Sequence, residues 1–527
     1  MKFQAIKGVR DILPPESALW NRVEQAAREV FWTYGYGEIR LPIFESTELF
    51  ARSVGLDTDI VSKEMYTFED SPEGLEADRR RVALRKPDLA NWGDTEEYLD
   101  DLETLTRRLE RAERNETLPR GNSQIIAELQ TIHRRADELR HDPLQSVDEY
   151  WQMFESAREL AAAVIIQDLL SLRPEATASV VRAYIEHGMQ TRPGNVKLYY
   201  VGPMFRRERP QKGRYRQFYQ IGAELLGPSD HPALDAETIE MLLAFFARVN
   251  LKGATLYVNS IGDKNCRPAY VERLRGELQK VRDKLGADSQ RRIETNPLRV
   301  LDSKLQEEQA VIETLPRIAD HLCDACREHY AELKRQLALR NIAYEENWRL
   351  VRGLDYYMRT TFEITAPGLG SQNAVCGGGR YDGLVELLGG PAATKGIGFA
   401  IGTDRLMLSL QEAGTAETCG LEVFVAWFGA KTYPAAVTLA RKLRERKLSV
   451  ELPAQEMKFG KSLSLADRLG ARFAVIVGED EMAAGLFTVK RLADGDQRKL
   501  TEAELFTYLA ESQRGDSSAN KIYTRSE

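Results

Sequence analysis

Two runs of residues with the composition of β-strands flank a short loop that is rich in positive charge. The first run is "VKLYYVGPMF" at 196–205, and the second is "YRQFYQIGAELLG" at 215–227. Two such runs joined by a short polar loop predict an antiparallel hairpin. Six bases and one acid lie in and beside this loop: Arg206, Arg207, Glu208, Arg209, Lys212, Arg214 and Arg216. We therefore expect a long hairpin whose loop concentrates cations.

The chain as a whole is acidic, with 527 residues and a formal net charge of -7. Residues 71–165 hold 21 acids and 14 bases, a net charge of -7, so this segment accounts for the acidity of the whole chain. The same segment is poor in aromatic residues and rich in helix-forming ones. Because the negative charge is segregated there, it does not cancel the cations of the hairpin loop.

The length of the chain predicts several domains, because one hydrophobic core rarely serves so many residues. No apolar run reaches the roughly 18 to 20 residues of a membrane span. The best candidate, "LAAAVIIQDLL" at 160–170, is short and contains Asp168. The N-terminal "MKFQAIKGVRDILPPE" lacks the apolar core of a signal peptide. We therefore expect a cytoplasmic protein with no membrane segment.

Secondary-structure signals change along the chain. Apolar residues at helical spacing predict a helix over 19–31, and "EIRLPIF" predicts an edge strand, because Pro42 has no N–H to donate. Such an edge can meet a partner subunit. A helical block is predicted from about 263 to 340. From about 421, strand-like and helix-like runs alternate, which is typical of a small α/β domain.

One run, "HLCDACREH" at 321–329, contains residue types that bind metals. The four residues are His321, Cys323, Cys326 and His329. The run reads as a helix, and spacings of two and three residues spread these side chains around a turn, where they do not close a tetrahedral cage. We therefore expect no metal site there.

Arginine in the hairpin loop suits a polyphosphate ligand, because a guanidinium binds phosphate oxygens in pairs and stays charged at physiological pH. Glu208 follows Arg206 by two residues, so on a strand both side chains share one face, which favours a shaped ligand. On the returning strand Phe218 and Gln220 have the same spacing, and Phe218 can stack on a base. The alternatives are a solvated basic turn and ordinary sheet packing.

Several motifs together resemble those of the class II aminoacyl-tRNA synthetases. "YGYGEIRLPIFESTELF" resembles their first motif, "FRRE" with "RQFYQ" the second, and "GIGFAIGTDRL" the third. "KGVRDILPPE", "SLRPEATASVVRAYIEHGM", "LVRGLDYYMRTTFE" and "GGGRYDGLVE" resemble segments of the histidyl-tRNA synthetases. The resemblance covers nearly all of the chain except residues 71 to about 165.

This resemblance implies an α+β fold, in which an antiparallel sheet carries the active site and a C-terminal α/β domain binds the anticodon. The balanced charge of residues 422–511, with 14 bases and 13 acids, does not itself indicate that role. The implied divisions are a catalytic core at 1–70, 166–262 and 346–415, an acidic helical insert at 71–165, a helical insertion at 263–345, the anticodon-binding domain at 421–512 and a disordered tail at 513–527.

The implied activity is that of a histidine–tRNA ligase: ATP and histidine form histidyl-adenylate, and the histidyl group passes to tRNA(His). Mg²⁺ accompanies the ATP phosphates, the protein itself holds no metal, and a homodimer forms through the first motif. Two arginines of the ATP site contact phosphates: Arg206 binds the α-phosphate, and Arg214 reaches the outer phosphates. Glu208 contacts the adenine amino edge, and Phe218 and Arg405 cover the two faces of the adenine. Glu363 lies close to the site.

The resemblance also assigns residues to the other substrates. Arg352 and Arg206 are the catalytic arginines, and both contact the α-phosphate. Arg352 also lies near the histidine carboxylate. Glu175 and Thr177 hold the histidine ammonium, with Gln220, Glu224, Tyr356, Tyr357 and Tyr381 around the substrate. Arg209, Gln211 and Lys212 face the acceptor end of tRNA.

The chain departs from the family pattern at three places. Ala176 stands where glycine is usual; if the position requires positive φ, alanine costs on the order of 1 to 2 kcal/mol. Asp404 replaces the usual glutamate and has a shorter reach. The acidic insert stands where a short turn is expected, and we hypothesise that it contacts a partner or restricts tRNA approach; unchanged kinetics and association state after its deletion would contradict this.

One alternative function belongs to a different class. Some proteins that resemble histidyl-tRNA synthetases are catalytically silent regulatory subunits of ATP phosphoribosyltransferase, the first enzyme of histidine biosynthesis. Such a subunit is expected to lack the ATP-binding arginines and the C-terminal domain, whereas Arg206, Arg352 and Arg405 are all present here. A synthetase for another amino acid would not explain the segment "LVRGLDYY", which resembles a histidyl-tRNA synthetase segment.

Overall fold

The computed structural model describes residues 3–55, 58, 60–70, 75–88, 91–114, 118, 121–139, 147–164, 168–369, 373–413 and 421–518. They fall into two compact units, residues 1–11 with 22–416 and residues 12–21 with 417–527. No helix in the described ranges is long and apolar enough to cross a membrane.

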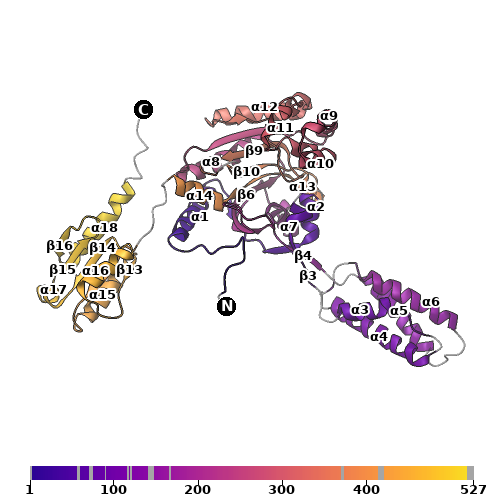
Figure 1. Ribbon diagram of the computed structural model, residues 1–527, viewed down its shortest axis with the longest axis horizontal. Helices are drawn as coiled ribbons and strands as arrows, with labels where there is room; N and C mark the ends of the chain where they lie inside the picture. The colour runs from indigo at the N-terminus through magenta and orange to yellow at the C-terminus, as the bar shows by residue number, and fades with distance from the viewer. Residues whose placement is uncertain are drawn as a thin grey trace. The chain divides into compact units, whose positions relative to one another are not determined.

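An eight-stranded sheet forms the centre of the first unit, with helices around it (Figure 1). Its strand order is β1-β5-β6-β11-β10-β9-β7-β8. The two outermost pairs, β1 with β5 and β7 with β8, are parallel, and the other pairs are antiparallel. The strands are β1 (Gly37–Glu38), β5 (Val196–Phe205), β6 (Gln217–Gly227), β7 (Thr255–Ser260), β8 (Glu345–Glu346), β9 (Met358–Thr365), β10 (Ala374–Arg380) and β11 (Lys395–Gly402).

The predicted hairpin is confirmed as β5 and β6, which pair in register from Val196 with Leu226 to Phe205 with Gln217. A short bridge between Gln211 and Arg214 closes the loop. The predicted edge strand is only partly right. β1 ends at Glu38, and β2 (Phe44–Ser46) belongs to a second, three-stranded sheet with β4 (Asp168–Leu172) and β3 (Tyr66–Asp70), so the chain leaves the large sheet before Pro42.

The helices that pack on the sheet are amphipathic, with an apolar stripe facing inward. The predicted first helix is α1 (Glu16–Thr33), in which Val23, Ala27 and Phe31 are almost wholly buried. The others of this unit are α2 (Thr47–Val54), α7 (Thr177–Glu186), α8 (Pro232–Arg248), α9 (Arg267–Lys280), α10 (Ala287–Thr295), α11 (Gln306–Ile312), α12 (Asp324–Leu339), α13 (Leu384–Leu387) and α14 (Thr403–Glu412). Side chains of α9 to α12 share one core with those of β5, β6 and α7.

The acidic segment is helical, in α3 (Leu75–Leu84), α4 (Trp92–Arg114), α5 (Ser123–Leu139) and α6 (Val147–Ala163). It has a core of its own, in which Leu102, Leu105 and Phe154 are fully buried. Its two ends join β3 and β4, which pair with each other, so the insert extends from a hairpin and leaves the large sheet intact.

The C-terminal unit contains a five-stranded sheet of order β13-β12-β14-β15-β16 with helices packed on it. The strands are β12 (Val423–Trp427), β13 (Val450–Glu451), β14 (Phe473–Val477), β15 (Phe487–Arg491) and β16 (Gln497–Leu500), and the helices are α15 (Tyr433–Glu445), α16 (Phe459–Arg468), α17 (Glu479–Ala484) and α18 (Glu502–Ser518). The predicted α/β pattern is confirmed. Residues 513–518, expected in a disordered tail, are the last residues of α18, and residues 519–527 lie outside the described ranges.

Candidate active site

A cavity of about 350 Å³ lies on one face of the large sheet. One row of residues crosses this face in register: Tyr200, Gly222, Ala400, Gly377 and Glu363, on β5, β6, β11, β10 and β9. The three central positions are small. The sheet therefore leaves space above its centre, between the larger side chains at the ends of the row.

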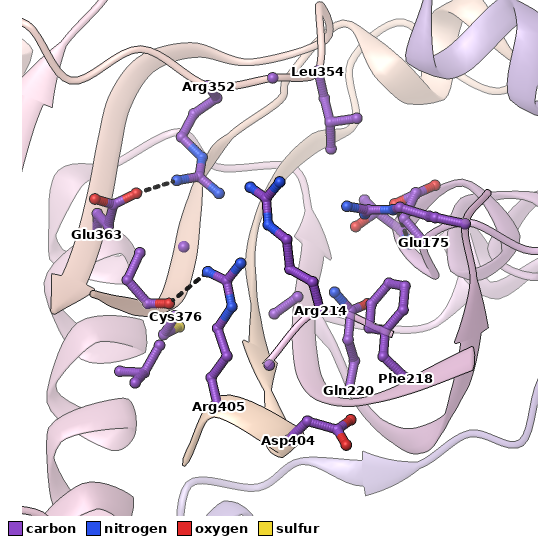
Figure 2. Close-up of a pocket in the computed structure, with 18 of the residues that line it drawn as sticks. Glu175, Arg214, Phe218, Gln220, Arg352, Leu354, Glu363, Cys376, Asp404 and Arg405 are labelled. Carbon is purple, nitrogen blue, oxygen red and sulfur yellow. Dashed lines mark hydrogen bonds and ion pairs between the residues drawn. The ribbon is translucent and has the colours of Figure 1, made fainter. Parts of the chain in front are cut away.

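Arginines from separate parts of the chain converge on this space. Arg214 comes from the hairpin loop, Arg352 from the segment before β9 and Arg405 from α14, and Figure 2 shows all three pointing into the cavity. Arg352 Nη1 lies 3.1 Å from Glu363 Oε2, and Arg405 Nη1 donates to the Ala374 carbonyl at 3.0 Å. Burial lowers the pKa of Arg405, and Arg214 nearby acts in the same direction. An anion bound among these groups would relieve their mutual repulsion.

Arg206 also lines the cavity. Its Nε donates to the Pro174 carbonyl at 2.9 Å, and its guanidinium carbon lies 5.1 Å from the centre of the Phe218 ring, within the range of a cation–π contact. Glu208 Oε1 is 3.9 Å from Arg206 Nη1. The two ion-pair partners are thus neighbours in the cavity wall.

Several buried polar atoms of the wall have no hydrogen-bond partner within the described part of the chain. They are Tyr200 Oη, Glu208 Oε2, Arg214 Nε, Gln220 Oε1 and Arg352 Nε. Of these, Glu208 Oε2 has a charged neighbour, Arg214 Nη1 at 3.4 Å. Buried polar groups in folded proteins are almost always hydrogen-bonded. Five such atoms around one cavity therefore indicate a polar ligand.

A hydrogen-bonded network of acids and hydroxyls lies at one end of the cavity. Glu175 accepts hydrogen bonds from the backbone amides of Thr177 and Ala178, at 2.8 and 2.9 Å, at the start of α7. Glu224 accepts from the Thr177 hydroxyl at 2.7 Å and from the Tyr381 hydroxyl at 2.5 Å. Burial raises the pKa of the Glu224 carboxyl to about 8, with Glu175 adding to the rise against the two hydrogen bonds. Burial also raises the pKa of Glu175.

The cavity brings together most of the site residues predicted from the sequence. Twelve of them line it: Glu175, Thr177, Arg206, Glu208, Arg214, Phe218, Gln220, Arg352, Tyr356, Tyr357, Glu363 and Arg405. Glu224 and Tyr381 do not line the cavity. Glu224 is connected to its wall because it accepts from the Thr177 hydroxyl, and Tyr381 in turn donates to Glu224. Arg209, Gln211 and Lys212, assigned to the acceptor end of tRNA, are exposed in the hairpin loop and do not line this cavity.

One structural prediction made from the sequence was wrong, and the condition set for strain at Ala176 is not met. β5 ends at Phe205, so Arg206 and Glu208 do not share a strand face, and the hairpin loop itself turns both toward the cavity. Ala176 has φ -111°, so the position does not require glycine and carries no left-handed strain.

Asp404, the shorter substitute for glutamate, is well placed in spite of its reach. Its Oδ1 lies 3.1 Å from Arg10 Nη2, and its Oδ2 accepts from the backbone amide of Tyr219 at 2.9 Å. The N-terminal "KGVRD" segment, through Arg10, thus supports α14 and β6 beside the cavity.

A second cavity of about 560 Å³ shares Arg206, Glu208 and Arg214 with the first. Six bases line it against two acids: Lys63, Glu64, Arg206, Glu208, Arg214, Arg291, Arg292 and Arg299. Arg291 and Arg292 lie on α10 and Arg299 follows it. These three arginines were not predicted from the sequence, because nothing in a charged helical pattern distinguishes an arginine that faces a distant hairpin loop from one in solvent.

A largely antiparallel sheet with an arginine-lined cavity, joined to a small C-terminal α/β domain, is the arrangement of a class II aminoacyl-tRNA synthetase. The family model for histidyl-tRNA synthetase matches residues 153–406, and the model for the anticodon binding domain matches residues 422–512. A histidine–tRNA ligase of Koribacter versatilis is 46% identical over 511 residues, covering 96% of each chain. The chain therefore belongs to the histidyl-tRNA synthetase family.

Solved structures agree. Apo histidyl-tRNA synthetase from S. aureus matches with a TM-score of 0.63 and 30% identity, over 96% of this chain and 100% of that one. A structure from Bacillus halodurans, described as an ATP phosphoribosyltransferase regulatory subunit/histidyl-tRNA synthetase, matches with a TM-score of 0.52 at 16% identity over 91% of this chain and 98% of that one. At that identity the second likeness concerns the fold alone.

Proposed function

We propose that this enzyme attaches histidine to tRNA(His) in two steps, in the cytoplasm. The histidine carboxylate attacks the α-phosphate of ATP, giving histidyl-adenylate and pyrophosphate, and the terminal adenosine of the tRNA then attacks the activated carbonyl. The observation that carries this proposal is the single cavity that joins Arg206, Arg352 and Arg405 to the polar network at Glu175 and Thr177. A phosphate site and an ammonium site must adjoin if a carboxylate is to meet an α-phosphate.

The arginines act on the first step by placing positive charge where negative charge develops. Arg352 and Arg206 face the α-phosphate, and Arg352 also orients the histidine carboxylate. Arg214 faces the outer phosphates, Glu208 the adenine amino edge, and Phe218 and Arg405 the adenine ring. Because Arg206 lies over Phe218 in the free protein, we expect it to move from the ring toward phosphate when ATP binds.

Mg²⁺ would be held mainly by the ATP phosphates, with one protein carboxylate in support. Mg²⁺ prefers oxygen ligands, and the Glu363 carboxylate of the cavity wall provides them. Glu363 accepts from Arg352 Nη1 through one oxygen, at 3.1 Å. This donor set fits the ion, which when bound would offset phosphate charge.

The polar network selects histidine. Glu175 and Thr177 hold the ammonium, and Gln220, Glu224, Tyr356, Tyr357 and Tyr381 surround the imidazole directly or through Thr177. Buried groups that need a partner reject an analogue that cannot pair with them.

Histidine affinity should depend on pH through Glu224. Its carboxyl has a pKa of about 8 in the free protein, so it is mostly protonated at pH 7, and a bound cation favours its charged form. We expect affinity to rise between pH 7 and about 8, by at most about tenfold per pH unit, with a proton released on binding. Calorimetric titration in two buffers of different ionisation enthalpy measures both. Glu224→Gln is the control, because it cannot ionise; proton release that persists in this variant would contradict the assignment.

The second cavity is suited to the acceptor end of tRNA, together with Arg209, Gln211 and Lys212 of the loop. Its excess of cations attracts phosphates. Arg292→Ala should raise the KM for tRNA several-fold and leave ATP–pyrophosphate exchange unchanged, with exposed Arg335→Ala on α12 as the control. A raised KM for ATP would instead assign this cavity to the ATP phosphates. The C-terminal domain would bind the anticodon.

We also propose a homodimer that forms through the first motif. Phe44 of β2 and Phe68 of β3 are 53% and 42% exposed, and their ring centres lie 6.1 Å apart on the small sheet. Exposed aromatic pairs of this kind are typical of protein interfaces. Phe68→Asp should convert a dimer into a monomer in light scattering, while the exposed Thr67→Asp on the other face should not; a monomeric parent protein would contradict the proposal.

The deciding experiment is ATP–pyrophosphate exchange with histidine and with each of the other amino acids. We expect exchange with histidine alone. Exchange with none would favour the regulatory subunit of ATP phosphoribosyltransferase as the alternative, and exchange with a different amino acid would overturn the specificity.

A further inference from the structure

Three cysteines and one aspartate form a compact cluster outside the active site. The ligand atoms of Asp263, Cys266, Cys323 and Cys326 all lie within 4.8 Å of one another. Cys266 Sγ is 3.6 Å and Cys323 Sγ is 3.8 Å from Asp263 Oδ1. Asp263, Cys266 and Cys326 are buried, and Cys323 is partly exposed. Neither histidine of the "HLCDACREH" run takes part: His321 lies against the Tyr270 ring, and His329 Nε2 is 3.1 Å from the Asp230 carbonyl oxygen.

The fold assembles the cluster from two helix starts that are far apart in the sequence. Cys266 immediately precedes α9, and Cys323 immediately precedes α12, with Cys326 in the first turn of α12. Gly262 has φ +66°, and an added Cβ there would lie 2.7 Å from Cys266 Sγ, so this turn requires glycine. Each helix start contributes two ligand groups separated by two residues, which is the spacing of zinc-binding loops.

We propose that this cluster binds one structural Zn²⁺ through three thiolates and one carboxylate. A tetrahedral zinc ion with Zn–S bonds of about 2.3 Å and a Zn–O bond of about 2.1 Å separates a sulfur ligand from an oxygen ligand by about 3.6 Å. The distances from Asp263 Oδ1 to the sulfurs of Cys266 and Cys323 are 3.6 and 3.8 Å. Zinc favours thiolate ligands over the oxygen ligands that Mg²⁺ prefers. On binding, the three thiols lose their protons to solvent and the carboxylate enters ionised.

The surroundings orient the aspartate for this role. The backbone amide of Asn265 donates to Asp263 Oδ1 at 2.9 Å, and Arg359 Nη2 lies 3.5 Å from Asp263 Oδ2. Such outer contacts are typical of metal ligands. With zinc, three thiolates and one carboxylate carry two net negative charges, which Arg359 partly offsets. A surface hollow lined by Cys266 and Cys323 provides a route of entry.

A redox role does not account for this cluster. Reactive cysteines lie in partly exposed positions, whereas Cys266 and Cys326 are buried. The aspartate also has no part in a disulfide. A metal accounts for all four residues.

The site would tie the helical insertion to the catalytic sheet. Arg267, next to Cys266, donates from Nη1 to the backbone carbonyl of Tyr357 at 2.6 Å, and Tyr357 lines the active-site cavity. Loss of the metal should therefore also raise the KM for histidine.

The test is the zinc content of the tag-free, full-length protein purified from zinc-supplemented medium, measured by mass spectrometry of the metal. We expect about one zinc ion per chain, and less than about a tenth of that in Cys323→Ser and Cys326→Ser. Asp263→Cys should retain zinc, and His321→Gln is the matched control that should also retain it. Cobalt substitution should produce thiolate-to-cobalt charge-transfer absorption.

Three results would overturn the proposal: a zinc-free parent protein after zinc-replete purification, full zinc content in both serine variants, or an intact mass showing a disulfide among these cysteines. If the serine variants fail to fold, titration of the parent protein with a mercurial thiol reagent decides the matter. Zinc release in step with thiol modification supports the site, and absence of release contradicts it.

Discussion

Replacement of Arg352 by alanine is expected to slow histidyl-adenylate formation by at least about a hundredfold, the scale of losing one preorganised donor. The guanidinium is oriented before substrate arrives, because Glu363 holds it at 3.1 Å. Its buried Nε has no hydrogen-bond partner within the described chain and is left to bind the substrate. Histidine binding should survive, because the ammonium and imidazole contacts remain. Arg352→Lys should not restore the rate, since a single ammonium cannot reproduce the planar fork of donors.

Single-turnover adenylate formation measures the rate, and calorimetry measures histidine binding. Arg335→Ala, an exposed arginine on α12, is the control and should behave as the parent protein. A near-normal rate for Arg352→Ala would refute the role assigned to this residue and weaken the proposed mechanism.

Gly377→Ala is expected to reduce adenylate formation by about a hundredfold although no charged residue is replaced, as a small misplacement of a catalytic side chain can do. A Cβ at Gly377 would overlap the Arg352 guanidinium and force it out of place. Because the obstructed atoms are at the end of a flexible side chain, the fold should absorb the change with little loss of thermal stability.

Two neighbouring variants separate this effect from damage to the fold. Gly383→Ala meets nothing within 4 Å and should retain full activity. Gly378→Ala would overlap the Gly398 carbonyl oxygen and the Phe362 ring on the opposite face of β10, and should cost roughly 1 to 3 kcal/mol of stability. Equal loss of stability in Gly377→Ala and Gly378→Ala would show that the first variant acts through folding.

Local patterns were enough to predict most of the elements. The hairpin 196–227, the first helix and the alternating C-terminal domain each depend on residues close in sequence, whose spacing reports the face that is buried. Twelve of the motif residues named from the sequence line one cavity. Their roles still depend on the experiments above.

The sequence was less informative where distant segments meet. Burial raises the pKa of Glu224 only because β6, α7 and Tyr381 enclose it. Arg292 faces the hairpin loop only because α10 packs beside that loop. No metal site was expected at the cysteine run 321–329, because only the spacing within the run was considered. The other two residues of the four-residue cluster, Asp263 and Cys266, come from the start of another helix.

The order of strands and helices, the cationic loop and the family follow from the amino-acid sequence, because hydrophobic periodicity, turn residues and motifs are properties of short stretches. The cavity, its unpaired polar atoms, the shifted carboxyl of Glu224 and the four-residue cluster follow from packing. These features depend on distances between segments far apart in the chain, and such distances are set by burial of the common core, which no local pattern records.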